Sequence, residues 1–322
     1  MFIARLQVVV KRLYGLDGLR GVAALAVVAY HYFDSLAYYG LLGVELFFII
    51  SGFVILMTLE RVKTVGEFAL HRFARLYPAY WLSVVVAGCF LLLTHQASIG
   101  QAALNATMLQ GFFGHSDLVD PYWTLAFELW FYVLMAILFA FNQLKNLECL
   151  ALIWLAVMFA FRAVMIFGRG TGLYWNWQFH LLAMPQFGHL FIAGMMIYRA
   201  RSHGWSRSTA AVLLLAIIYS AFGRPDWAAV SSPVYFVVNA IFICAVVSAS
   251  AQGGFFDAPL LVWFGQRSYS IYLLFEPARL IAIYVLGDDL AGVATGLALT
   301  MIAASLSWTF IERPAQVWAR GP

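Results

Sequence analysis

Charged residues are scarce in this chain of 322 residues: Asp, Glu, Lys and Arg make up only 11% of it, against about 25% in an ordinary soluble domain. Hydrophobic residues make up 64%, and the mean hydropathy is +0.85. So few polar side chains cannot cover the surface of a globule in water. The composition therefore excludes a water-soluble protein.

Cysteine is rare as well, and Cys89, Cys149 and Cys244 lie far apart. There is no CxxC pair and no mixed Cys/His cluster, so the sequence predicts neither a disulfide framework nor a metal site. The formal net charge is +4, an excess that the cytoplasmic loops of a membrane protein ordinarily supply. We therefore expect contact with membrane lipids and no binding of nucleic acid.

Apolar segments of membrane-spanning length recur along the chain. About 20 residues cross the roughly 30 Å of hydrocarbon in a bilayer, and lipid leaves helices as the only structure for such segments. The sequence thus predicts an all-α, polytopic integral membrane protein of one domain, 1–322, with no fused extracytoplasmic domain. We expect about ten transmembrane helices, at 16–38, 41–60, 77–95, 121–143, 147–168, 183–201, 209–223, 230–251, 263–287 and 289–312.

Loop charges predict the orientation. The loops on one side of the predicted spans carry only two basic residues, Arg169 and Arg224. The loops on the other side carry 14 of the chain's 19 basic residues: Arg5, Lys11, Arg12, Arg61, Lys63, Arg72, Arg75, Lys145, Arg199, Arg201, Arg207, Arg267, Arg313 and Arg320. Because cytoplasmic loops are enriched in Lys and Arg, we expect both termini in the cytoplasm. The basic segment 61–76 is then expected to be an interfacial helix on the cytoplasmic surface.

Charged and titratable residues inside spans are costly and mark functional candidates. The first helix carries Arg20 and His31, eleven positions apart. At 100° and 1.5 Å per residue they share one face and are separated by about 16 Å along the axis. Arg20 is thus expected near the cytoplasmic end, and His31 in the outer half, where it is a candidate general base.

A carboxylate at the depth of His31 could orient its imidazole. Glu128 in the fourth span is expected at that depth, about 10 Å below the outer surface, which predicts a base-and-orienter pair. Weaker candidates for binding an acceptor are Glu45, Tyr122, Trp123 and Glu276, although Glu276 and Arg279 could instead neutralise each other as an i, i+3 pair.

Six motif-like segments follow one another along nearly the whole chain. They are LDGLRGVAALAVVAYH (Leu16–His31), with an Arg and a His separated by ten residues, GVELFFIISGFVI (Gly43–Ile55), FALHRFARLYPAYW (Phe68–Trp81), WTLAFELWFY (Trp123–Tyr132), FGQRSYSIYLLFEP (Phe264–Pro277) and FIERP (Phe310–Pro314). In sequence and in order, these segments resemble the motifs of the acyltransferase 3 family.

The resemblance implies a membrane-bound O-acyltransferase, most often an O-acetyltransferase. The donor would be acetyl-CoA or another acyl-CoA from the cytoplasm, and the acceptor a carbohydrate, a lipid-linked sugar or another envelope molecule of a bacterial cytoplasmic membrane. Arg20, Arg72 and Arg75 would then bind the CoA phosphates. One departure is Phe275, which stands where the family commonly has His in its ninth-helix motif.

Two other hypotheses remain at this point. Buried Arg, His and Glu also line the paths of transporters and flippases for lipid-linked sugars or small anions, although we find no inverted repeat. A non-catalytic scaffold or sensor is the second. Aromatic residues expected on the outer side could stack on sugar rings or simply form the aromatic belt of a membrane interface: Tyr38, Tyr39, Phe112, Phe113, Tyr122, Trp123, Tyr174, Trp175 and Trp177.

Overall fold

The computed structural model describes residues 12–33, 36–167, 177–225, 230–251 and 253–321. All regular elements within these ranges are helices, which confirms the all-α prediction. The α-helices are α1 (Tyr14–Phe33), α2 (Gly43–Leu59), α3 (Val65–Leu93), α4 (Ile99–Asn105), α5 (Trp123–Ala140), α6 (Leu147–Phe167), α7 (Trp177–Ala183), α8 (Gly188–His203), α9 (Arg207–Tyr219), α10 (Ser232–Ser250), α11 (Pro259–Leu286), α12 (Leu290–Ser307) and α13 (Arg313–Arg320).

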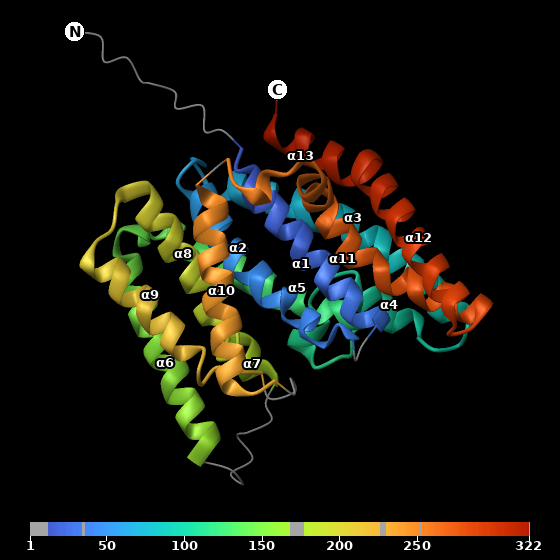
Figure 1. Ribbon diagram of the computed structural model, residues 1–322, viewed down its shortest axis with the longest axis horizontal. Helices are drawn as coiled ribbons and strands as arrows, with labels where there is room; N and C mark the ends of the chain where they lie inside the picture. Colours follow the sequence, from blue (N-terminus) through green and yellow to red (C-terminus); the bar gives the residue numbers. More distant parts are fainter. Residues whose placement is uncertain (1–11, 34–35, 168–176, 226–229, 252, 322) are drawn as a thin grey trace.

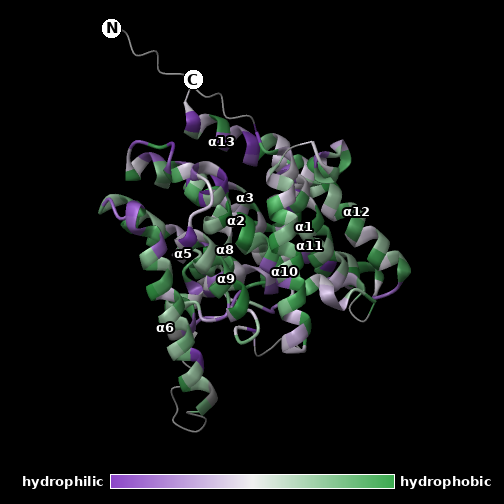
Figure 2. Ribbon diagram, turned by 60° about the vertical axis from the view of Figure 1, so that its left-hand side comes forward, coloured by the Kyte–Doolittle hydropathy of each residue, from purple (hydrophilic) through white to green (hydrophobic). Residues whose placement is uncertain are grey.

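Eight helical segments of the described chain are long and apolar enough to cross a membrane, against the ten predicted. The expected spans 16–38 and 209–223 are not among these eight. The first corresponds to α1, whose polar residues lower its hydropathy, and the second to α9, which has only 13 residues. Figure 2 shows hydrophobic residues over most of the helical surface, with hydrophilic ones gathered near helix ends and in α13. The protein is a multi-pass membrane protein.

The basic segment 61–76 is not a separate helix but leads into a longer one. Residues from Val65 onward form the first turns of α3, a continuous helix of 29 residues that runs through the expected third span. Thr64 caps its start, because the Thr64 hydroxyl accepts a hydrogen bond from the Glu67 amide. Both Arg72 and Arg75 are therefore held on a long helix and project into the bundle.

Glycines bring two pairs of helices into close contact. In Figure 1, α1 lies beside α11, and α2 lies beside α8. A Cβ atom on Gly265 of α11 would overlap the Asp17 carbonyl of α1, and one on Gly194 of α8 would overlap the Ile49 carbonyl of α2. Small residues allow such approach of helix backbones in membrane proteins. The helix that carries Arg20 and His31 is thus fixed against α11.

We expect Gly265→Ala to destabilise the protein by about 1–3 kcal/mol, because backbone atoms of α1 must move to admit the methyl group. Gly66→Ala is the matched control, since a Cβ there would meet only the Thr64 hydroxyl, at 4.0 Å. Thermal unfolding in detergent measures both. Equal unfolding midpoints in the two variants would contradict the close α1–α11 contact.

A proline inside α11 links that helix to α3. Pro277 lacks an N–H group, so the carbonyl of Leu273, four residues earlier, loses its partner in the helix. The Ser83 hydroxyl of α3 donates a hydrogen bond to this carbonyl at 2.6 Å. The Tyr269 hydroxyl likewise donates to the Leu76 carbonyl at 2.9 Å. These bonds hold α3 and α11 together on one side of the candidate site.

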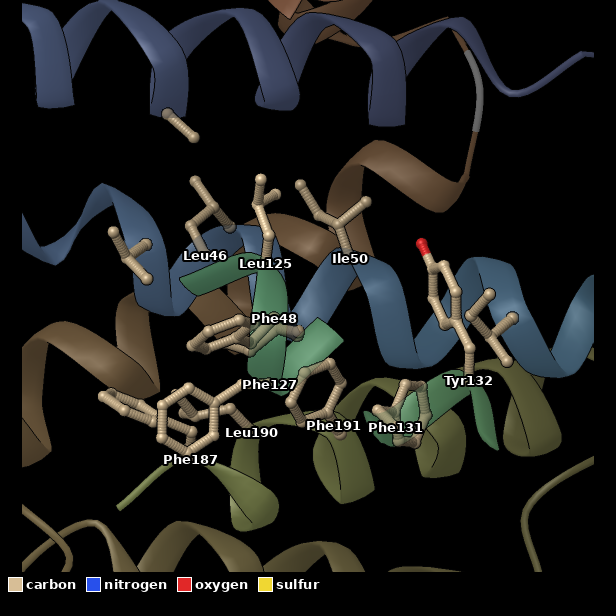
Figure 3. Close-up of a cluster of buried hydrophobic side chains, with 14 of the residues drawn as sticks. Leu46, Phe48, Ile50, Leu125, Phe127, Phe131, Tyr132, Phe187, Leu190 and Phe191 are labelled. Carbon is tan, nitrogen blue, oxygen red and sulfur yellow. The ribbon is translucent and has the colours of Figure 1, made fainter. Parts of the chain in front are cut away.

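Phenylalanines fill the core between α2, α5 and α8 (Figure 3). The rings of Phe131 and Phe191 stack with their centroids 4.2 Å apart, and Phe48 lies 4.8 Å from Phe191 and 5.0 Å from Phe187. The Tyr132 hydroxyl points away from this cluster in Figure 3. It enters the cavity described next.

Candidate active site

A cavity lies between α1, α2, α3, α5 and α11. Three arginines line it: Arg20 from α1, and Arg72 and Arg75 from α3. The structure thus brings together the three cations that the sequence analysis grouped. The rest of the lining is aromatic and aliphatic, with further polar groups from Ser51, Thr124, Glu128, Tyr132, Tyr269 and Tyr272.

Two of the arginines keep binding capacity for a ligand. The Nε atoms of Arg20 and Arg72 are buried and have no hydrogen-bond partner among the described residues. The Arg72 guanidinium lies 5.7 Å from the Tyr132 ring and 5.8 Å from the Phe68 ring, a cation–π arrangement. Unpaired guanidinium N–H groups beside a cavity suit an anion with several oxygen atoms.

Arg75 differs from the other two because an acid neutralises it. Its guanidinium forms an ion pair with Glu312, which is fully buried. The Glu312 carboxylate also accepts hydrogen bonds from the Ser270 hydroxyl at 2.7 Å and from the Gln316 amide at 3.1 Å. A π-helical turn, Trp308–Glu312, places this acid on the inner side of the chain between α12 and α13.

Removing one member of the Arg75–Glu312 pair should cost about 3–5 kcal/mol of stability, because the remaining charge stays buried without a partner. We therefore expect Arg75→Met and Glu312→Met each to lower the thermal midpoint strongly. The double variant should recover much of the loss, since two apolar side chains leave no buried charge. Additive losses would show that the pair does not act as a unit.

The structure does not place Glu128 against His31, which corrects the expected base-and-orienter pair. Its carboxylate accepts hydrogen bonds from the Ser51 hydroxyl at 3.2 Å and from the Tyr132 hydroxyl. It also lines the cavity and interacts electrostatically with Arg20. Two residues at the same depth on two helices contact each other only if their side chains point toward each other. His31 on α1 and Glu128 on α5 point toward different partners.

His31 has a different carboxylate partner, Asp120. Its Nδ1 lies 2.9 Å from the Val27 carbonyl oxygen, which can only accept a hydrogen bond, so Nδ1 carries a proton. Its Nε2 lies 3.3 Å from Asp120 Oδ2. This leaves Nε2 as the nitrogen that can exchange a proton with a substrate.

Two aromatic rings lie between the cavity and His31. Tyr272 lines the cavity, and its ring centroid is 6.3 Å from that of Phe275. The Phe275 ring in turn lies 4.8 Å from the His31 ring. Phe275, which replaces the family's usual His, thus supplies an apolar surface against the imidazole. These two rings separate His31 from the cavity.

The four weaker candidates separate into different environments. Tyr122 is fully buried and shares a hydrogen bond of 2.7 Å with Ser83, and Trp123 packs on Phe187. Glu276 forms two hydrogen bonds with Arg279, at 2.9 and 2.6 Å, as the neutralising pair considered above. None of these three side chains is an open sugar-binding surface.

Glu45 is also buried, at 1% exposure, and both of its carboxylate oxygens lack a hydrogen-bond partner within the described chain. It belongs to a polar group between α2 and α10 with Tyr235 and Asn239, whose polar side-chain atoms are likewise unpaired there.

Some residues named in the sequence predictions lie outside what the structure describes. They are Tyr174, Trp175 and the side chain of Trp177 among the expected outer aromatics, and the loop residues Arg5, Lys11 and Arg169.

Sequence reasoning missed Asp120, Ser51 as a partner of Glu128, and Glu312. Asp120 follows a loop and precedes a Pro, so no helical periodicity pointed to it. A signal was present for Glu312, because an acid in the FIERP segment at the end of an apolar helix requires a cation.

A family model described as an acyltransferase domain matches residues 13–312. The chain belongs to the acyltransferase 3 family. The match contains every residue of the site described above, and it favours an enzyme over the transporter and scaffold hypotheses. Among the described residues of this acyltransferase, no group of three or more His, Cys, Asp or Glu could hold a metal ion.

Curated relatives are O-acetyltransferases. The acyltransferase is 26% identical over 343 residues to the peptidoglycan O-acetyltransferase OatA of Listeria monocytogenes, covering 93% of this chain and 55% of the relative. It is 28% identical over 345 residues to the O-acetyltransferase OatA of Staphylococcus aureus, covering 93% and 56%. The chain thus spans about half the length of the curated relatives it matches. No solved structure matches it.

Proposed function

We propose that this acyltransferase is an O-acetyltransferase that moves an acetyl group from cytoplasmic acetyl-CoA to a carbohydrate hydroxyl on the outer side of a bacterial cytoplasmic membrane. The observation that carries the proposal is the convergence of three arginines on one cavity, with a histidine and a carboxylate just beyond it. The names of the two relatives support O-acetylation and a glycan acceptor.

The arginine cavity suits the phosphates of the donor. Arg20 and Arg72 offer unpaired N–H groups, and a guanidinium binds phosphate oxygens through two parallel hydrogen bonds. Beyond its phosphates, CoA carries a pantetheine arm with the chain length of about four residues, or about 14 Å when extended. Along α1, Arg20 and His31 are separated by about 16 Å. The two lengths are similar, and the rings of Tyr272 and Phe275 would have to move aside for the thioester to reach His31.

His31 is the group placed to activate the acceptor. Its Nε2 would take the proton from the attacking hydroxyl as the oxygen bonds to the acetyl carbon. The C–S bond then breaks, and the CoA thiolate leaves and takes up a proton. The backbone carbonyl of Val27 fixes the tautomer that this role requires, because it holds the proton on Nδ1.

Acetyl transfer from radiolabelled acetyl-CoA by purified protein in detergent tests the proposal. Detergent micelles expose both ends of the bundle, so the assay needs no assumption about orientation. We expect label in a carbohydrate product and free CoA in equal amount. Binding of acetyl-CoA without any product or CoA release would reject the function.

Glu128→Gln tests what the cavity carboxylate does. The substitution keeps the shape of the side chain and removes its charge, which offsets Arg20. Since Glu128 lines the donor cavity and does not contact His31, we expect a change in the KM for acetyl-CoA and an unchanged pH–rate profile. A shifted pH profile with unaltered donor KM would instead favour the original hypothesis that Glu128 acts on His31.

A further inference from the structure

Beyond the arginine cavity, the surroundings of His31 contain a group that the donor does not need. The Asp120 side chain is 71% exposed, whereas that of His31 is 16% exposed. Asp120 begins a 3-10 turn, Asp120–Tyr122, directly before α5. Its carboxylate therefore lies at the protein surface, 3.3 Å from the His31 nitrogen that is free to take a proton.

The backbone that carries Asp120 is held firmly. The next residue, Pro121, has a restricted φ angle, and its carbonyl accepts hydrogen bonds from the Thr124 hydroxyl at 2.9 Å and from the Tyr272 hydroxyl at 3.3 Å. Tyr272 also lines the donor cavity. The position of the carboxylate relative to the cavity is thus fixed by structure and does not depend on a mobile loop.

A row of tyrosines leads from His31 toward the surface. The Tyr30 ring lies 5.0 Å from His31 and 6.1 Å from Tyr38, and Tyr38 lies 5.8 Å from Tyr39, each pair edge-to-face. Tyr39 is 60% exposed. The His31 imidazole thus contacts an exposed carboxylate through Nε2 and the first ring of an aromatic row through its own ring. Apolar aromatic surface and a strong hydrogen-bond acceptor are the chemistry that a sugar matches with its C–H faces and its hydroxyls.

We propose that Asp120, Tyr38 and Tyr39 form the acceptor subsite of this enzyme and that it takes an uncharged, polyhydroxylated sugar ring. This inference rests on the proposed function. One sugar hydroxyl donates a hydrogen bond to Asp120 while a hydroxyl beside it donates to His31 Nε2, and the tyrosine rings contact the apolar face of the sugar.

The charges around His31 decide the class of sugar. Asp120 faces it from the 3-10 turn, and Glu276 acts on it electrostatically from α11. Arg279 neutralises Glu276 through two hydrogen bonds, so the negative charge that an acceptor meets beside His31 is that of Asp120. An acceptor with its own carboxylate near the reacting hydroxyl would be repelled, because like charges across a binding site disfavour association.

The test is steady-state kinetics in detergent with acetyl-CoA and chitotetraose, an uncharged oligomer of N-acetylglucosamine. We expect Asp120→Asn to raise the KM for chitotetraose by about tenfold or more, the effect of losing a hydrogen bond to a charged group. Asp120→Glu should recover part of this loss. Tyr39→Ala should raise the same KM by about threefold with kcat unchanged.

Two neighbouring variants serve as matched controls. Asp117 lies three residues before Asp120, and burial raises its pKa to about 6, while a hydrogen bond from Gln110 acts in the opposite direction. Asp117→Asn keeps an acceptor for the Gln110 amide, which binds Asp117 at 2.6 Å. Tyr284 is another exposed tyrosine, at 68% exposure, away from this row. Asp117→Asn and Tyr284→Ala should leave the acceptor KM unchanged.

Failure of the subsite and failure of the function give different results. Wild-type transfer with an unaltered acceptor KM in Asp120→Asn, Tyr38→Ala and Tyr39→Ala would overturn the subsite and leave the function standing. Transfer to tetragalacturonate, an acid-bearing oligomer, with none to chitotetraose would overturn the assignment to uncharged sugars. Absence of any transfer by the wild-type protein would overturn the proposed function and the subsite with it.

Discussion

His31→Ala is expected to lower turnover by about 10²–10⁴-fold, the loss typical of a general acid–base group. Alanine removes Nε2, the nitrogen that faces Asp120, but the rest of α1 stays packed on α11. Donor binding should persist, because the arginine cavity does not include His31 in its lining. The measurement is kcat for acetyl transfer together with calorimetric affinity for acetyl-CoA.

His115→Ala is the control for this prediction. His115 is an exposed histidine in the loop that precedes Asp120, so its removal changes the local histidine content without touching the site. Its turnover should match that of the wild type. Near-normal turnover in His31→Ala would remove His31 from the mechanism and direct attention to Asp120 as the base.

The second large effect is expected for donor binding in Arg72→Ala. We expect affinity for CoA to fall by about 1–3 kcal/mol, or about 5- to 150-fold, as a charge-assisted hydrogen bond to phosphate is lost. Arg72 makes cation–π contacts and no ion pair within the described chain, so its removal should cost less stability than that of Arg75. Arg72→Ala therefore tests donor binding with little loss of stability, whereas removal of Arg75 would change both donor binding and stability.

Arg72→Lys sharpens the result, because lysine keeps the charge and loses the planar fork of the guanidinium. We expect an intermediate affinity for it. Arg201→Ala, an exposed basic residue near the end of α8, should bind CoA normally. An unchanged dissociation constant in Arg72→Ala, measured by calorimetry, would assign this arginine to membrane orientation alone.

The helical architecture and the grouping of the arginines could be predicted from sequence because both depend on local periodicity and charge. Apolar runs of about 20 residues require helices in lipid. The predicted cytoplasmic side of the spans placed Arg20 near Arg72 and Arg75, and the structure puts all three on one cavity. The number of spans is harder to predict, because α1 and α9 lie at the margin of the hydropathy and the length that a spanning helix needs.

Partners across helices could not be predicted in the same way. Glu128 and His31 were expected at the same depth, but which acid meets His31 depends on the rotation of α5 and on the turn before it. The structure gives that place to Asp120. In the same way, the π-turn that brings Glu312 to Arg75 shifts the helical register by one residue, and no feature of the local sequence announces it.

The close contact between α1 and α11 makes α1 a spacer of fixed length. Arg20 and His31 sit on one uninterrupted helix of 20 residues, and glycine contacts prevent that helix from sliding along its neighbour. One alanine inserted between them would turn His31 by about 100° and raise it by about 1.5 Å, so the imidazole would leave Asp120. Under the proposed function, the number of residues between Arg20 and His31 therefore sets the distance between the phosphate end and the thioester end of the donor. Longer acyl chains need not change that number, since they extend beyond the thioester and not between it and the phosphates.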